Sequence, residues 1–251
     1  MTAPLFDISG KVACVTGASS GLGRAAGLML AAAGVRVVGV ARRADALKDW
    51  QSDATGDTAI VTGDLADRSA LQDIAKAAAQ PFGPPDILIN AAGINTRQHA
   101  DDVDATGWDT TLNLNLSAPF FLAQAMVPAM RDKGWGRIVN FASLQSSRAF
   151  ANGISYGASK GGVTQMTRAM AEAWSRFGIT ANAVAPGFFR TELTAPVFNN
   201  PELAQANADQ TCIGRNGEPS DLDGPLMFFC SDASSYVTGQ TLYVDGGYTA
   251  K

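Results

Sequence analysis

The sequence predicts one doubly wound α/β domain over residues 1–251, with a seven-stranded parallel sheet and helices on both faces. Three observations predict this fold class. Short apolar runs alternate with longer helical patterns, which is typical of parallel strands joined by crossover helices. The runs are apolar almost throughout, as in strands that are covered on both faces. The chain also contains no linker, repeat or low-complexity tract, and its length suits a single domain.

The individual elements follow from the apolar patterns and from the residues that end them. Gly34, directly after the first helical stretch, is typical of a helix C-terminus. The expected strands are Lys11–Thr16, Val35–Ala41, Thr58–Thr62, Ile87–Asn90, Arg137–Phe141, Ile179–Val184 and Thr241–Val244. The expected helices lie at Arg24–Ala33 and near Ser69–Ala79, Trp108–Arg131, Ser155–Phe177 and Ser220–Ser231.

The longest stretch without a clear pattern is Gly187–Gly217. Because it lies between two expected strands, it is not a domain boundary. Long irregular stretches inside a domain are usually functional, and a doubly wound sheet binds its ligands at the carboxyl ends of its strands. We therefore expect a small helical lid or substrate loop at about residues 187–217.

The composition excludes several classes of protein. Apolar residues make up 46% of the chain, charged residues 17%, and the net charge is −4. Without a basic run, no nucleic-acid partner is expected. No apolar stretch approaches the roughly 20 residues of a membrane span, and the segment Met1–Asp7 lacks the basic and apolar regions of a signal peptide. These features favour a cytoplasmic protein without a membrane partner.

Metal and disulfide chemistry are not expected either. Cys14, Cys212 and Cys230 form no Cys-x-x-Cys pair, and an odd number of cysteines is typical of reduced thiols in the cytoplasm. His99 is the only histidine, so the chain has no Cys/His cluster of the kind that binds zinc. The prediction is that no metal is bound.

A glycine-rich turn connects the first expected strand to the first expected helix. Gly17, Gly21 and Gly23 follow the spacing G-x-x-x-G-x-G, which differs from the common dinucleotide fingerprint G-x-G-x-x-G. Glycines at such a turn let a pyrophosphate approach the helix N-terminus closely, and Ser19 and Ser20 add hydroxyl donors. A glycine cluster alone is weak evidence, but this position favours a dinucleotide-binding, Rossmann-type domain.

Tyr156 and Lys160 stand at i and i+4 of an expected helix, so both side chains share one face. The ordinary pKa of tyrosine, about 10, is too high for a base near neutrality. A nearby ammonium group stabilises the tyrosinate, and we therefore expect Lys160 to lower the pKa of Tyr156. Such a pair suits proton transfer to or from a hydroxyl group.

Four motifs in the right order resemble those of the short-chain dehydrogenase/reductase family. Thr16–Gly23 is similar to its cofactor turn, and Asn90–Gly93 to its Asn-Asn-Ala-Gly motif, with Ala91 in place of the second Asn. Asp64–Leu65 resembles the pair that meets the adenine ring, and Pro186–Thr191 the stretch beside the nicotinamide. The resemblance covers essentially the whole chain.

The resemblance implies hydride transfer between a nicotinamide cofactor and an alcohol or ketone, with four catalytic residues. Tyr156 is the acid/base, and Lys160 modulates its pKa and binds the ribose. Ser143, 13 positions before Tyr156, holds the substrate oxygen. Asn115 holds a water beside the lysine; Asn113 is the competing choice for this role.

The cofactor preference is indicated by the end of the second expected strand. An acidic residue there would bind the ribose hydroxyls of NAD, but this chain has Ala41 followed by Arg42 and Arg43. Guanidinium groups suit the 2′-phosphate of NADP, so NADP is favoured, although Asp45 nearby leaves NAD open. The predicted cofactor-binding residues are Gly17, Ser19, Ser20, Gly21, Leu22, Gly23, Arg42, Asp64, Leu65, Asn90, Ala91, Gly93, Tyr156, Lys160, Pro186, Gly187, Phe189 and Thr191.

The resemblance implies that the substrate is a small alcohol or ketone. Within the family, several segments are most similar to gluconate 5-dehydrogenase-like enzymes, which implies a sugar acid or polyol. Alternatives are a broad carbonyl or 3-oxoacyl-type reductase and, from another class, a nucleotide-sensing protein without catalysis. The candidate substrate residues are Asn95, Arg97, Gln145, Arg148, Phe150 and Phe188. By resemblance, the long helical segments pair between subunits, which implies a homotetramer.

Overall fold

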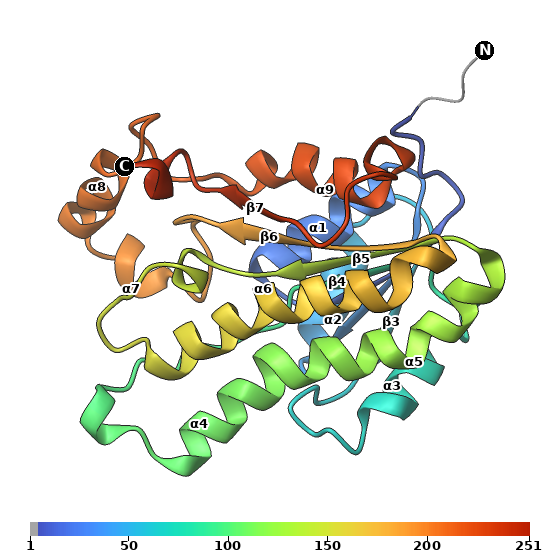
Figure 1. Ribbon diagram of the computed structural model, residues 1–251, viewed down its shortest axis with the longest axis horizontal. Coiled ribbons are helices and arrows are strands. Elements are labelled where there is room, and N and C mark those ends of the chain that lie inside the picture. The colour runs from blue at the N-terminus through green and yellow to red at the C-terminus, as the bar shows by residue number, and fades with distance from the viewer. Residues whose placement is uncertain (1–4) are drawn as a thin grey trace.

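The computed structural model describes residues 5–251. Met1–Pro4, part of the segment in which no signal peptide is expected, lie outside the described residues. Seven parallel strands form one sheet in the order β3-β2-β1-β4-β5-β6-β7, which confirms the predicted fold class (Figure 1). The strands are β1 Val12–Thr16, β2 Arg36–Ala41, β3 Thr58–Thr62, β4 Ile87–Asn90, β5 Gly136–Phe141, β6 Ile179–Pro186 and β7 Thr241–Val244.

Helices cover both faces of the sheet, and each face has its own apolar core. One core packs α1, α2 and α9 against the sheet, and the other packs α3, α5 and α6. Figure 1 shows the layer of α5 and α6 on the side of the sheet opposite α1 and α9. The helices are α1 Gly21–Ala32, α2 Ala44–Asp53, α3 Leu71–Ala78, α4 Ala105–Leu112, α5 Ala118–Lys133, α6 Ile154–Trp174, α7 Ala195–Phe198, α8 Pro201–Asp209 and α9 Asp223–Cys230.

Two elements differ from the sequence prediction. Helix α2 was not expected, because only Leu47 and Trp50 of its ten residues are buried, too few for a clear apolar period. The expected helix at residues 108–131 is instead α4 and α5 joined by a π-helical turn, Asn113–Ser117. The spacing of apolar residues does not distinguish such a turn from continuous α-helix. The π turn contains one residue more than an α-helical turn, and this shifts the apolar positions only locally.

The chain order of the strands reverses at β1, which pairs with β2 on one side and β4 on the other. This reversal is the place where doubly wound sheets form a ligand crevice, because the connections leave the sheet in opposite directions. The segment at residues 187–217, for which a small helical lid or substrate loop was expected, contains α7 and α8. These helices lie at one end of the molecule together with the C-terminus (Figure 1).

Three further findings concern the described residues. No helix among residues 5–251 combines the length and the apolar character needed to cross a bilayer. Within the same range, no three His, Cys, Asp or Glu side chains are grouped as metal ligands. Cys14 and Cys230 are buried free thiols, and Cys212 is an exposed one.

Candidate active site

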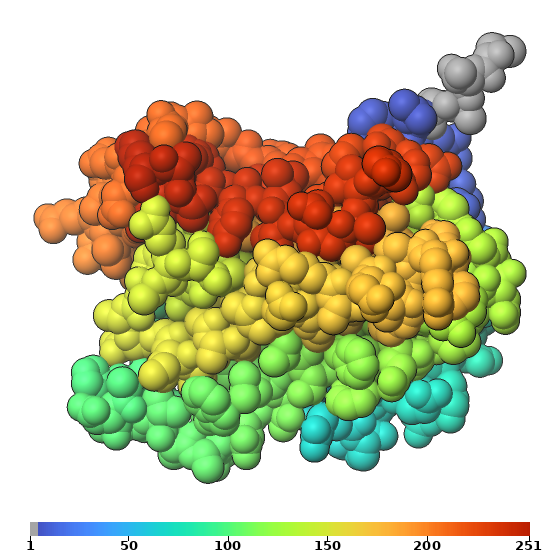
Figure 2. All heavy atoms as spheres, in the orientation of Figure 1, coloured from blue at the N-terminus to red at the C-terminus, as the bar shows by residue number. Residues whose placement is uncertain are grey.

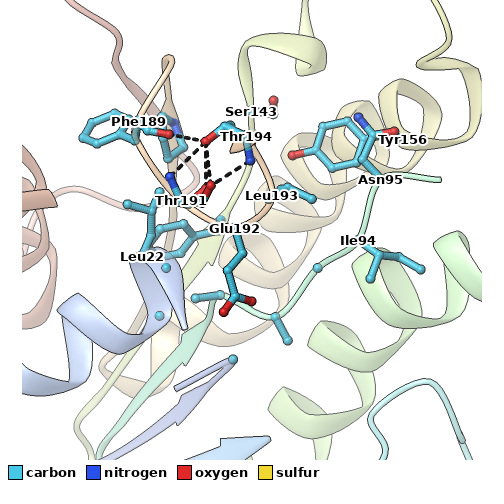
Figure 3. Close-up of a pocket in the computed structure, with 18 of the residues that line it drawn as sticks. Leu22, Ile94, Asn95, Ser143, Tyr156, Phe189, Thr191, Glu192, Leu193 and Thr194 are labelled. Atoms are coloured by element: carbon cyan, nitrogen blue, oxygen red, sulfur yellow. Dashed lines mark hydrogen bonds between the residues drawn. The ribbon is translucent and has the colours of Figure 1, made fainter. Parts of the chain in front are cut away.

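A cavity of about 830 Å³ lies at the carboxyl ends of the strands. Its wall contains nearly all of the residues that the sequence predicted, drawn from every part of the chain. Figure 3 shows part of this wall. From the cofactor and catalytic sets these are Gly17, Ser19, Ser20, Gly21, Leu22, Gly23, Arg42, Asp64, Leu65, Ala91, Gly93, Ser143, Tyr156, Lys160, Pro186, Gly187, Phe189 and Thr191. From the substrate set they are Asn95, Arg97, Gln145, Phe150 and Phe188.

The glycine turn forms one end of this cavity and leaves no room for side chains. A Cβ atom on Gly17 would lie 2.9 Å from the backbone nitrogen of Ala92, and one on Gly23 only 2.5 Å from the carbonyl oxygen of Gly17. The N-cap residue of α1, Ser20, makes no side-chain capping bond. The first N–H groups of α1 therefore remain available, and this cradle fits the pyrophosphate of a dinucleotide.

We expect Gly17→Ala to destabilise the fold by about 2–4 kcal/mol, because it combines a left-handed backbone with a backbone clash. Gly10→Ala is the matched control. Both glycines have φ +73°, but a Cβ atom on Gly10 would contact nothing within 4 Å. Urea unfolding should give a cost of about 1–2 kcal/mol for the control. Equal costs for the two variants would contradict the clash.

Tyr156 and Lys160 lie one turn apart near the N-terminus of α6, and both are buried. The Lys160 Nζ donates a hydrogen bond of 2.6 Å to the carbonyl oxygen of Phe141 and lies 5.7 Å from the centre of the Tyr156 ring. Burial lowers the pKa of Lys160 to about 8. The lysine thus still carries most of its charge at neutral pH.

The pKa of Tyr156 differs from the sequence expectation, which was that Lys160 lowers it. Burial of the phenol raises its pKa, while a hydrogen bond with Ser143 and the positive charge of Arg97 act in the opposite direction. Loss of hydration opposes the tyrosinate more strongly than the nearby charges favour it. At neutral pH the phenol therefore holds its proton.

Ser143 follows β5 and begins a short 3₁₀ turn, Leu144–Ser146. Its hydroxyl accepts a hydrogen bond of 3.1 Å from the backbone N–H of Gln145, which fixes the side chain beside Tyr156. Figure 3 shows Ser143 and Tyr156 facing the cavity together with Asn95. A substrate oxygen in this position can contact both hydroxyl groups.

Asn115 lies on the π-helical turn and is buried, although it is not part of the cavity wall. Its side chain accepts a hydrogen bond from the N–H of Ile94 and donates one to the carbonyl of the same residue, each of 2.9 Å. A Cβ atom on Gly93 would lie 3.2 Å from Asn115 Oδ1 and 3.7 Å from Lys160 Nζ. The π turn, a feature often found at functional sites, thus brings Asn115 close to the lysine.

Besides Asn115, two further predicted site residues are not part of the cavity wall. Asn90 is buried in the sheet, where its Nδ2 donates a hydrogen bond of 2.9 Å to Asn140 Oδ1. Arg148 donates hydrogen bonds to the carbonyl oxygens of Thr249, at 3.4 Å, and Lys251, at 2.7 Å. Asn90 therefore supports the sheet and Arg148 holds the C-terminal residues, whose segment lies on the surface at the same end of the molecule as α8 (Figure 2).

The end of β2 presents two cationic side chains to the cavity, those of Arg42 and Arg43. Asp45, the acidic residue that left NAD open, is exposed on α2, where it pairs with Lys48 at 3.1 Å. It is not part of the cavity wall. The residues at this point of the cavity therefore fit a phosphate better than two ribose hydroxyls.

The sequence prediction expected a substrate loop beyond Thr191 but named none of its individual side chains. Glu192, Leu193 and Thr194 also line the cavity, and Figure 3 shows them between Leu22 and Asn95. The Thr194 hydroxyl donates to the Phe189 carbonyl, which folds this segment over the site. A motif that ended at Thr191 gave no signal for them, and a stretch without periodicity does not indicate which side chains point inward.

Comparisons with known proteins agree with this geometry. The family model described as Enoyl-(Acyl carrier protein) reductase matches residues 17–249. The gluconate 5-dehydrogenase of Gluconobacter oxydans is 40% identical over 98% of this chain and 97% of its own length. The galactitol 2-dehydrogenase (L-tagatose-forming) of Cereibacter sphaeroides is 39% identical, also over 98% of this chain and 97% of its length.

A solved structure adds a match in three dimensions. The gluconate 5-dehydrogenase of Burkholderia cenocepacia, in complex with NADP and tartrate, superposes with a TM-score of 0.90 at 33% identity and covers 98% of both chains. Sequence, fold and site geometry thus agree over the full length. The chain belongs to the short-chain dehydrogenase/reductase family and is a nicotinamide-dependent enzyme that interconverts a secondary alcohol and a ketone by hydride transfer.

Proposed function

We propose that this enzyme acts on a sugar acid or polyol and uses NADP in preference to NAD. The proposal is carried by Arg42, Arg43 and Arg97, three cationic side chains in the wall of the cavity that also holds the buried pair of Tyr156 and Lys160. The intact pair also argues against a nucleotide-sensing protein without catalysis, because such a protein needs no buried ammonium group next to a phenol.

In the direction of ketone reduction, Ser143 donates a hydrogen bond to the substrate oxygen and Tyr156 delivers its phenolic proton to that oxygen. When bound, the nicotinamide cofactor supplies the hydride. The raised pKa of Tyr156 keeps the phenol protonated before the step. Lys160 and Arg97 then stabilise the tyrosinate that forms, and Asn115 belongs to the route by which it regains a proton. Oxidation of the alcohol follows the same route in reverse.

The residues proposed to hold the cofactor are the predicted ones that line the cavity. The glycine turn and the first N–H groups of α1 bind the pyrophosphate, and Asp64 and Leu65 lie where the adenine ring is expected. Arg42 and Arg43 bind the 2′-phosphate. This preference is supported by the position of Asp45 outside the cavity wall and by the NADP in the Burkholderia cenocepacia structure.

The substrate class is supported by the relatives and by the polar side of the cavity. The related enzymes act, by their names, on gluconate and galactitol, and the tartrate complex contains a hydroxy acid. Arg97, next to Asn95 in the wall, can pair with a carboxylate. The other side is apolar: Phe150 and Phe188 line the wall, and both pack against Tyr248, which lies outside it, with ring centres 5.7–6.3 Å apart.

The experiment that tests this function is a panel of sugar acids, polyols and 3-oxoacyl esters with NADP(H) and NAD(H). We expect turnover of a sugar acid or polyol, with kcat/KM higher for the phosphorylated cofactor, measured by the absorbance of the reduced nicotinamide. A 3-oxoacyl-[acyl-carrier-protein] reductase of Vibrio cholerae is 34% identical to this chain. Turnover of 3-oxoacyl esters alone would therefore replace the sugar-acid proposal by that activity.

Three broader features belong to the same proposal. The chain acts as one catalytic domain in which residues 187–217 form the substrate loop, supported by their contribution to the cavity wall.

The assembly is a homotetramer, supported by the exposed apolar side chains of Phe121 on α5 and Leu242 on β7. Sedimentation velocity at micromolar concentration of the chain tests the number of subunits. The enzyme works in the cytoplasm, in keeping with its free thiols.

A further inference from the structure

An ion pair spans the cavity between two segments that are far apart in the sequence. Arg43, just after β2, donates hydrogen bonds of 3.0 Å and 3.3 Å to the two carboxylate oxygens of Glu192, which follows β6. Both residues line the cavity. The guanidinium of Arg43 also donates, at 3.4 Å, to the hydroxyl of Ser19 in the glycine turn. The guanidinium group of Arg43 thus connects three segments of the proposed cofactor site: the end of β2, the glycine turn and the segment after β6.

The two arginines at the end of β2 differ in their partners. In residues 5–251, Arg42 makes no side-chain hydrogen bond or ion pair, so its guanidinium can bind a ligand in the cavity without losing a protein contact. In Arg43, by contrast, both terminal nitrogens of the guanidinium group donate hydrogen bonds to Glu192. Glu192 thereby occupies the pair of terminal nitrogens at which a guanidinium group binds a carboxylate or a phosphate in a bidentate manner.

We infer that Glu192 is a specificity-determining residue, whose carboxylate competes with the 2′-phosphate of NADP for Arg43. This inference rests on the proposed use of NADP. While Glu192 holds Arg43, a phosphate at the end of β2 has Arg42 alone as a full partner and a carboxylate nearby as a like charge. The residue therefore moderates the preference for NADP and leaves NAD a usable cofactor.

The exposure of the pair makes this competition feasible. The side chains of Arg43 and Glu192 are 53% and 65% exposed. An ion pair so open to water contributes little to stability, and a phosphate carries more charge than a carboxylate. A ligand phosphate can therefore displace Glu192 at a small cost. Without the Glu192 carboxylate, the phosphate has no ion pair to break and no like charge beside it.

The test measures binding of two adenosine fragments, which differ in the 2′-phosphate, by isothermal titration calorimetry at constant ionic strength. We expect Glu192→Gln to tighten the binding of adenosine 2′,5′-bisphosphate by about three- to tenfold. The affinity for adenosine 5′-monophosphate should change by less than about twofold, because this fragment lacks the 2′-phosphate that Arg43 would bind. In an Arg43→Gln background, the gain from Glu192→Gln should disappear.

The matched control is Glu172→Gln, which removes an exposed carboxylate on α6, outside the cavity wall. The inference is overturned if Glu192→Gln leaves the bisphosphate affinity unchanged or weakens it, if both fragments shift equally, or if the control gives the same gain. Its failure is distinguishable from failure of the proposed function. In that second case, the unaltered chain would bind neither NADP nor the bisphosphate better than their counterparts without the 2′-phosphate.

Discussion

Tyr156→Phe is expected to lower kcat by about 10²- to 10⁴-fold, the usual contribution of a positioned acid or base. The substitution removes one oxygen atom from a buried ring and leaves the neighbouring hydroxyl of Ser143 and the ammonium group of Lys160 in place. Without the phenol, the substrate oxygen loses the group that is proposed to exchange a proton with it. Cofactor affinity should change little, because the ring itself remains.

Steady-state kinetics with a substrate from the panel, together with fluorescence titration of NADPH, separates the two effects. Tyr236→Phe is the matched control, because its side chain is fully exposed at 103% and lies outside the cavity wall. This control should keep its activity. Turnover of Tyr156→Phe close to that of the unaltered enzyme would remove the tyrosine from the mechanism.

Lys160→Met is expected to abolish most activity and, at the same time, to change how stability depends on pH. The loss of the ammonium group removes the charge that stabilises the tyrosinate, so kcat should fall by about 10²-fold or more. The same charge is costly for the fold, because burial lowers the pKa of Lys160 from 10.5 to about 8. This difference corresponds to about 3 kcal/mol of lost stability below pH 8.

The pH dependence has a definite sign. Below pH 8, Lys160 is protonated in both the folded and the unfolded chain, and the cost is constant. Between pH 8 and 10.5 the unfolded chain binds more protons, so the free energy of unfolding of the unaltered protein rises with pH. Relative to Lys160→Met, the rise should total about 3 kcal/mol across this window.

Urea unfolding at a series of pH values, followed by circular dichroism, measures this difference. Cys14 and Cys230, whose pKa values burial raises to about 12, also titrate differently on folding. They are present in both proteins, so their contribution cancels. Lys48→Met, which removes an exposed ammonium group on α2, is the matched control. A difference for Lys160→Met that does not change between pH 8 and 10.5 would mean that Lys160 is not a buried charge.

At neutral pH, Lys160→Met is expected to affect activity much more than stability. At pH 7, the methionine removes a buried charge but leaves the Phe141 carbonyl without its donor, at a cost of about 1–3 kcal/mol. The net change in stability is therefore small, whereas the loss of activity is large.

Much of the fold and of the site could be predicted from local patterns. The strands β3, β4 and β7 have the predicted bounds, and the other four differ by one or two residues at one end. Tyr156 and Lys160 share a helix face because their spacing matches the helical period. The glycine turn was identified because it joins a strand to a helix. Each of these inferences needs only residues that are neighbours in the sequence.

Other parts depended on contacts between distant segments. Arg148 was a substrate candidate, but it holds the C-terminus, 103 residues away. Arg43 pairs with Glu192, 149 residues away. Asn90 matched a cofactor motif, yet its side chain lies in the sheet beside Asn140. No local pattern contains the partner of a long polar side chain, because that partner is chosen by packing.

The sequence by itself thus determined the strand–helix alternation, the glycine turn and the common helix face of Tyr156 and Lys160, since these depend on spacing along the chain. Only the tertiary structure decided the direction of the Tyr156 pKa shift, which the sequence had predicted with the opposite sign. The physical reason is that hydration is lost through burial by the whole fold. The spacing of the two residues predicts that the ammonium group of Lys160 lies near Tyr156, but it does not predict how much hydration the phenol loses when the chain packs around it.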